Sequence, residues 1–130
     1  MTPQFPIRRA LAGAGLLLLA SLAIKIGERH GLSPETGNRL AGMMLGALVV
    51  VYANAVPKAL VPLARLTCDP AREQALRRFT GWALVLGGLG YMGASALAPA
   101  EFAGTLAMSL LAWALAAVVA RILWARRGAA

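Results

Sequence analysis

The sequence has 130 residues, of which 59% are hydrophobic and 14% are charged. Because about a quarter of the residues in soluble domains are charged, this composition argues against a soluble enzyme or binding domain and favours residence in a membrane. The formal net charge of +8 is of a kind found in nucleic-acid-binding proteins, but the basic residues lie between long apolar blocks, which argues against that partner.

Four apolar blocks follow one another along the chain, over residues 10–26, 40–56, 81–98 and 102–120. Each has roughly 17 to 20 residues, and about 1.5 Å per residue carries it across most or all of a ~30 Å hydrocarbon layer. Because lipid offers no partner to backbone amides, each block is expected to be helical. The sequence therefore predicts an all-α, four-helix transmembrane bundle forming a single domain over residues 1–130, with helices at about 10–27, 36–57, 70–98 and 101–124.

The first block also has features of a cleavable signal peptide. The stretch RRALAGAGLLLLASLA has a basic start, an apolar centre and small residues at Ser21 and Ala23. The apolar character continues through Ile24 and Ile26, however, and the other three helices would lose a packing partner on cleavage. Retention of this segment as the first membrane helix is therefore the favoured interpretation.

Turn formers in the first and third connections predict where two helices begin. Ser33 is expected to cap the second helix, and Pro34 suits its first helical position. In the third connection, Pro99 stops one helix and Glu101 favours the positive N-terminal end of the next. Connections this short make helices one and two, and helices three and four, antiparallel neighbours, so the bundle is expected to consist of two hairpins.

The middle connection joins the two expected hairpins. Residues 58–68 are apolar with spaced cations, which predicts a cytoplasmic amphipathic loop lying at the membrane interface. Asp69 then caps a further helix, Pro70 takes its first position, and Glu73 lies in its first turn. Because no helix breaker interrupts the next residues, one continuous helix is expected over residues 70–98.

The basic residues are distributed unequally between the two ends of the expected helices. Ten lie before block one, between blocks two and three, or after block four, and three lie in the other two connections. By the positive-inside rule, both termini and the middle loop are cytoplasmic in a bacterial-type inner (plasma) membrane. The ten are Arg8, Arg9, Lys58, Arg65, Arg72, Arg77, Arg78, Arg121, Arg126 and Arg127.

Small residues at helical spacing predict where the helices pack against one another. In lipid, helices associate through close van der Waals fit, so small residues mark the contacts. The third helix is expected to present one such face, which packs inside the monomer or, alternatively, forms the interface of a homodimer. The predicted packing residues are Gly42, Gly46, Ala83, Gly87, Gly90 and Ala94, with Ala112, Ala116 and Ala120 in the fourth helix.

Residues that carry enzyme chemistry are sparse in this sequence. His30 has no second His or Cys at ligand spacing, so neither a metal nor another cofactor is expected, and no charged residue lies at a membrane midplane. Cys68 is the only cysteine, which excludes an internal disulfide; a free thiol is expected, with palmitoylation or redox sensing as alternatives. The chain is therefore expected not to be an enzyme.

One polar cluster remains, at the cytoplasmic end of helices two and three. One interpretation is structural: the amide of Asn54 bonds a backbone carbonyl freed by Pro57, and the cations anchor to lipid phosphates. The other is functional, namely a small polar mouth that recognises a peptide, lipid or protein partner. The candidate partner-binding residues are Asn54, Pro57, Lys58, Arg77, Arg78 and Gly81.

The same stretch resembles the SdpI/YhfL family of membrane proteins, typified by an immunity and signalling protein for a secreted killing-factor toxin. The resemblance rests on NAVPK (residues 54–58) and RRFTGWALVLGGL (residues 77–89), and covers about Leu45 to Leu89. The family's Asn-x-x-Gly-x-Arg-Thr-Pro-Trp segment has no counterpart here. What carries over is Asn54, Pro57, Lys58, Arg78 and Gly81.

The sequence predicts a small inner-membrane protein of SdpI-like type that binds a peptide or protein partner, or signals, through its cytoplasmic middle loop. A small transporter of a hydrophobic or cationic solute is one alternative, although it needs a polar group at mid-membrane. An accessory subunit of a larger membrane complex is another. The expected partners are thus the lipid bilayer and a protein or peptide, with a homodimer as an alternative and no nucleic acid.

Overall fold

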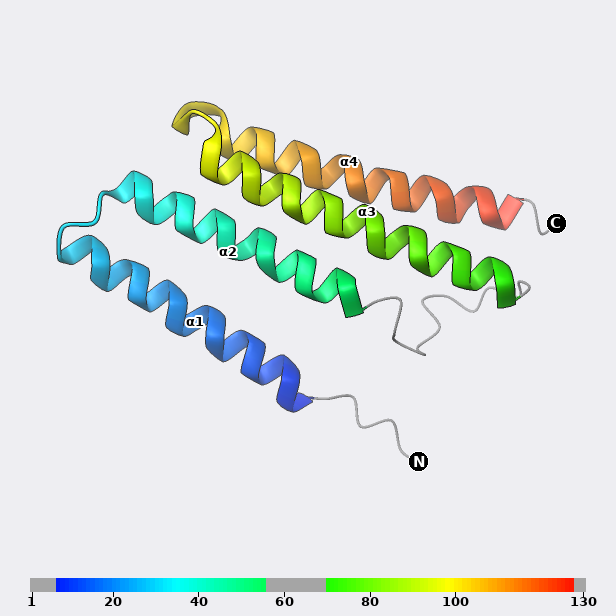
Figure 1. Cartoon of the computed structure of the whole chain (residues 1–130), viewed down its shortest axis with the longest axis horizontal. Coiled ribbons are helices and arrows are strands. Elements are labelled where there is room, and N and C mark those ends of the chain that lie inside the picture. Colours follow the sequence, from blue (N-terminus) through cyan, green and yellow to red (C-terminus); the bar gives the residue numbers. More distant parts are fainter. Residues whose placement is uncertain (1–6, 56–69, 128–130) are drawn as a thin grey trace. The chain divides into compact units, whose positions relative to one another are not determined.

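The computed structural model describes residues 7–55 and 70–127, and within them every regular element is an α-helix (Figure 1). The four helices are α1 (Ile7–Arg29), α2 (Pro34–Ala55), α3 (Pro70–Leu97) and α4 (Ala100–Arg127). The all-α prediction is confirmed, and the helices begin and end close to the expected residues. The chain divides into two compact units, Met1–Ala41 and Gly42–Ala130. The predicted interfacial loop, Pro57, Lys58, Cys68 and the Asp69 cap lie outside the described residues.

In the first unit, a glycine turn ends α1. Gly31 has a backbone φ of +109°, which a residue without a Cβ adopts at little cost. The amide of Leu32 donates to the Gly27 carbonyl at 2.9 Å, so that the chain closes over the last turn of α1 in the manner of a Schellman motif. This turn brings the start of α2 back to α1, and a Cβ on Gly37 would meet the side chains of Glu28 and Ile24.

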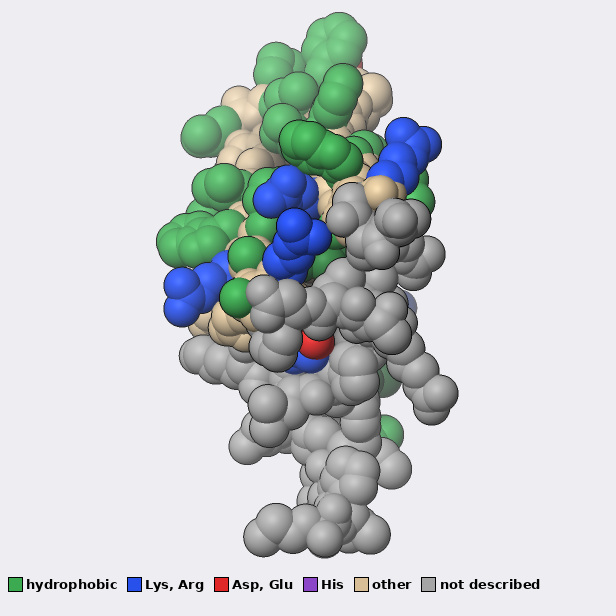
Figure 2. All heavy atoms as spheres, turned by 90° about the vertical axis from the view of Figure 1, so that its right-hand side faces the viewer, with side chains coloured by type: hydrophobic (Ala, Val, Ile, Leu, Met, Phe, Trp, Pro, Cys, Tyr) green, Lys and Arg blue, Asp and Glu red, His purple; other side chains and the backbone are tan. Residues whose placement is uncertain are grey.

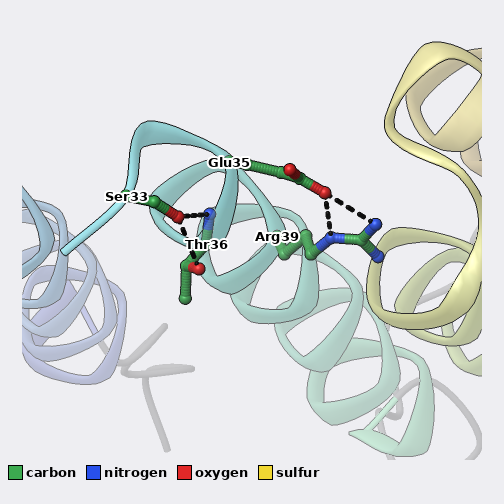
Figure 3. Close-up of polar contacts among 4 residues, drawn as sticks. All are labelled: Ser33, Glu35, Thr36 and Arg39. Carbon is green, nitrogen blue, oxygen red and sulfur yellow. Dashed lines mark hydrogen bonds and ion pairs between the residues drawn. The ribbon is translucent and has the colours of Figure 1, made fainter.

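The start of α2 carries the predicted cap (Figure 3). Pro34 is the first helical residue, and the Thr36 amide donates to the Ser33 hydroxyl oxygen at 3.2 Å. Such a bond satisfies one of the amides that a helix N-terminus leaves without a backbone acceptor. One turn on, Arg39 donates to Glu35 Oε1 from Nε at 3.2 Å and from Nη2 at 3.0 Å. The predicted roles of Ser33 and Pro34 are thus confirmed.

In the second unit, α3 and α4 form an antiparallel hairpin, and α3 also contacts α2 (Figure 1). The turn between them is tight because Pro99 stops α3 and its carbonyl accepts the Ala103 amide at 2.9 Å, which starts α4. Glu101 lies in the first turn of α4, where its charge opposes the helix dipole. The continuous third helix is confirmed over Pro70–Leu97.

Glycines on α2 meet α3 at very short range. A Cβ on Gly42 would lie 2.5 Å from Ser95 Oγ, and a Cβ on Gly46 would lie 2.8 Å from the Gly88 carbonyl oxygen. Contacts this short leave no room for a side chain, so the backbones of α2 and α3 lie very close together where the two helices cross. Gly88 and Ser95, which face α2, were not among the predicted packing residues.

A second face of α3 meets α4. A Cβ on Gly87 would lie 2.6 Å from Ala114 Cβ, and one on Gly90 would lie 3.3 Å from Leu110 Cδ1. Ala94 is buried, whereas Ala83 is half-buried. The expectation for α4 was wrong: Ala112, Ala116 and Ala120 are exposed. Ala107, Ala114 and Val118 lie on the inward side instead, because α4 presents a different face than its most regular alanine spacing suggests.

The interior of the described residues is built from small side chains, and the large apolar ones point outward. The buried apolar residues are Ala53, Ala94, Ala98, Ala107 and Val118, and none of the larger side chains is fully buried. On the surface, Leu18 is 72% exposed and Trp113 is 76% exposed. A soluble protein does not leave so much of its large apolar surface in contact with water, whereas a membrane protein presents it to lipid chains.

Three of the helices are long and apolar enough to cross a membrane, over Leu11–Arg29, Pro34–Asn54 and Ala100–Ala125. They support a membrane protein. The fourth expected span, in α3, is less apolar than the others, because its central turns contain five glycines together with Thr80, Tyr91 and Ser95. Glycine contributes little to membrane transfer, but it lets α3 approach its neighbours closely.

Candidate functional site

The candidate site lies where α2 ends and α3 begins, in the second unit. Six residues line a shallow hollow of about 370 Å³ there, which we call the α2–α3 hollow: Val50, Ala53, Asn54, Gly81, Trp82 and Val85. The first three belong to α2 and the last three to α3. The hollow exists because Ala53 and Gly81, both buried, have almost no side chain to fill the space between the helices.

Polar groups stand at the rim of this hollow. Asn54 is exposed, and its amide offers both hydrogen-bond donors and an acceptor. Trp82 is 66% exposed, and its indole presents an apolar face with one N–H donor. These groups can bind a peptide backbone or another uncharged polar segment. The described residues of the lining include no acid, base or nucleophile.

Of the four predicted partner-binding residues that the structure describes, two line this hollow, Asn54 and Gly81. Arg77 instead donates from Nε to Oε1 of Glu73 on its own helix at 3.1 Å, and its side chain is only 12% exposed. Arg78 is exposed and does not line the hollow. The other two predicted residues, Pro57 and Lys58, lie outside the described part of the chain.

A second hollow, of about 270 Å³, lies between the start of α3 and the end of α4. Its lining consists of Arg72 and Leu76 from α3, and Arg121, Trp124 and Ala125 from α4; we call it the α3–α4 hollow. The guanidinium carbon of Arg121 lies 5.5 Å from the centroid of the Trp124 ring, within the range of a cation–π interaction. Figure 2, which faces this end of the molecule, shows Lys and Arg side chains gathered among hydrophobic ones.

Sequence reasoning used Arg72 and Arg121 of the α3–α4 hollow only in the charge distribution across the membrane and missed their common location. Arg72 and Arg121 are 49 positions apart in the chain, and they line the same hollow because the hairpin turns at Pro99, near the midpoint between them. A helical hairpin pairs residues at equal distances from its turn. That pairing rule, applied to the predicted connection, was the signal that would have found them.

His30 is exposed beside the Gly31 turn, and no group of three His, Cys, Asp or Glu side chains within residues 7–55 and 70–127 is arranged to hold a metal ion. Ser109 donates to the Thr105 carbonyl at 2.7 Å, a bond within its own helix.

Comparison of the chain with protein-family models, with curated proteins and with solved structures finds no match in any of the three.

Proposed function

We propose that this chain is a non-enzymatic integral membrane protein that crosses the bilayer four times and binds a peptide or protein partner at the α2–α3 hollow. The observation that carries the proposal is that Asn54 and Gly81, 27 positions apart, line one hollow beside an exposed tryptophan. Both residues belong to the stretch that resembles the SdpI/YhfL family, and a shared SdpI-like ancestry is part of the proposal.

The fourth crossing is supported by the way α3 packs. Its glycines lie against α2 on one face and against α4 on another, and α4 is a candidate span in its own right. A helix that packs along a spanning neighbour over its length follows that neighbour through the bilayer, even when its own apolar character is moderate. Helix–helix contacts of small residues are the usual source of such association in lipid.

The proposed orientation has both termini and the segment between α2 and α3 in the cytoplasm of a bacterial-type inner membrane. Ten of the 13 Lys and Arg residues then lie on the cytoplasmic side, as the positive-inside rule requires. The α2–α3 hollow opens at that same end, because it is formed by the end of α2 and the early turns of α3.

A photo-crosslinking experiment tests the partner proposal. A photoreactive phenylalanine analogue is introduced at Val85, inside the hollow, and, as the matched control, at Trp113, which is exposed in the middle of α4. We expect a discrete protein adduct in cells from the Val85 site only. Asn54→Ala should abolish that adduct while the amount of the protein in the membrane fraction stays unchanged.

Three results would contradict the proposal. Identical adducts from Val85 and Trp113 would mean that the contact is a lipid-facing encounter and not a site. An adduct that survives Asn54→Ala at full intensity would show that the side-chain amide of Asn54 does not contribute to binding. A fall in membrane abundance equal to the fall in adduct would assign Asn54 to folding.

A further inference from the structure

The α3–α4 hollow places two guanidinium groups from different helices around one space. Arg72 lies in the first turn of α3 and Arg121 near the end of α4, with Leu76, Trp124 and Ala125 completing the lining. Both arginines are exposed. Across residues 7–55 and 70–127, neither of them forms an ion pair with a carboxylate.

The described carboxylates of this unit do not neutralise the hollow. Glu73 follows Arg72 directly in the chain, but its Oε1 accepts from Nε and Nη2 of Arg77. Glu101 belongs to the first turn of α4, at the opposite end of that helix from Arg121. Among the described residues of this unit, the arginines of the hollow therefore carry positive charge that no carboxylate balances and that an external anion can balance.

The depth of the hollow in a bilayer follows from helix length. Both α3 and α4 have 28 residues, so each is about 42 Å long at about 1.5 Å per residue. The hydrocarbon layer is only ~30 Å thick, and the headgroup layers bring the bilayer to about 40–45 Å. The ends of the α3–α4 hairpin thus reach the headgroup layer, where the phosphates of lipids lie.

We infer that the α3–α4 hollow binds the phosphate of an anionic membrane phospholipid. A guanidinium presents several N–H donors in one plane, which matches the oxygens of a phosphate. The cation–π contact with Trp124 holds Arg121 in place. Leu76 and Trp124 give apolar contact to the glycerol and the first methylenes of the lipid, so the lining suits a phosphate attached to acyl chains. This inference requires membrane residence but not the partner at the α2–α3 hollow.

Native mass spectrometry of the purified full-length chain in detergent tests the inference. The chain is titrated with phosphatidylglycerol, which is anionic, and with phosphatidylcholine, which carries the same phosphate without net charge. We expect one phosphatidylglycerol to bind preferentially. Arg72→Gln with Arg121→Gln should weaken that binding by about tenfold or more, since hydrogen bonds to charged groups are among the strongest in proteins.

A matched control removes the same charge elsewhere. Arg29→Gln with Arg127→Gln replaces two exposed arginines that do not line the hollow, and it should leave phosphatidylglycerol binding within about twofold of the parent, because only general attraction is lost. An equal loss in both double variants would reduce the effect to net charge and overturn the inference. Equal binding of the two lipids by the parent chain would overturn it as well.

Two further measurements separate the remaining alternatives. Arg121→Lys retains the charge but loses the planar fork, and it should bind phosphatidylglycerol less tightly than the parent and more tightly than Arg121→Gln; a lysine variant equal to the glutamine variant would contradict phosphate recognition. Inorganic phosphate or an acidic peptide at millimolar concentration should fail to displace the lipid. Displacement by either would show that the hollow binds a soluble anion and would overturn the inference of a lipid ligand. Unchanged helical circular dichroism in each variant verifies folding.

Discussion

The backbone of Gly46 lies where a side chain on Gly88 would be, and the backbone of Gly88 lies where a side chain on Gly46 would be. A Cβ on Gly46 would lie 2.8 Å from the Gly88 carbonyl oxygen, and a Cβ on Gly88 would lie 3.0 Å from the Gly46 carbonyl oxygen. This reciprocal contact fixes the crossing of α2 and α3 at one point of each helix. Small residues bring membrane helices together through close contacts, and at this point the contact is made by the backbone atoms of the two glycines.

Gly88→Ala is therefore expected to destabilise the protein, because the new methyl group would also lie 2.8 Å from Val50 Cγ2. Overpacking of this kind costs about 1–3 kcal/mol. Gly93→Ala, on the same helix, is the matched control, since nothing lies within 4 Å of its Cβ position. The control should be neutral or slightly stabilising. Unfolding curves of both variants in mixed micelles measure the difference, and equal stability would contradict the crossing.

A coupled pair tests the α3–α4 face. Gly87→Ala should destabilise the chain, because its Cβ would lie 2.6 Å from Ala114 Cβ. Ala114→Gly removes the opposing methyl group, so the double variant should recover part of the loss, whereas Ala114→Gly alone costs about 1 kcal/mol in helix propensity. Residues in contact show coupling energies of about 0.5–3 kcal/mol. Strictly additive effects of the two changes would place these residues apart.

The cap of α2 gives a local prediction. Ser33→Ala removes the acceptor of the Thr36 amide, and loss of an N-cap costs about 0.5–2 kcal/mol. Hydrogen exchange of the Thr36 amide should accelerate by roughly fivefold per 1 kcal/mol lost. Ser33→Asp keeps an acceptor and should retain protection. Fast exchange in the aspartate variant, or no change in the alanine variant, would contradict the cap.

Cysteine labelling tests the proposed four crossings. In a Cys68→Ser background, His30→Cys and Glu101→Cys should react with a membrane-impermeant maleimide added to intact cells. Arg72→Cys and Arg127→Cys should react only after the membrane is opened. The decisive pair is Arg72 and Glu101, because they lie near opposite ends of the α3 crossing. Labelling of both from the same side would show that α3 does not span the bilayer.

Most of the fold could be predicted from the sequence because its signals are local. Ser33 with Pro34, and Pro99 with Glu101, are residue types whose effect on the backbone depends only on their immediate neighbours, and each begins a helix where expected. The apolar blocks similarly indicate helices by length and composition. None of these signals requires knowledge of which helix lies beside which.

The contacts between helices could be predicted only in part. Gly42, Gly46, Gly87 and Gly90 are at helix contacts, but spacing alone could not tell which neighbour each face meets. α3 has glycines on two faces, and only the three-dimensional arrangement assigns Gly88 to α2. Arg77 illustrates the same limit for charges, because its pairing with Glu73 one turn away removes it from the candidate site.

Across the described helices, large side chains are nearly absent from the interior, and this has a consequence for how the chain tolerates substitution. In a water-soluble protein, surface positions accept most replacements, and buried ones accept mainly other apolar residues of similar size. Here the inward positions such as Ala107, which has no exposed surface, admit almost nothing bulkier. The outward positions tolerate nearly any apolar residue but not a charged one. Larger side chains are therefore harmful at inward positions, and charged side chains are harmful at outward positions. The two kinds of harmful replacement fall on opposite faces of each helix.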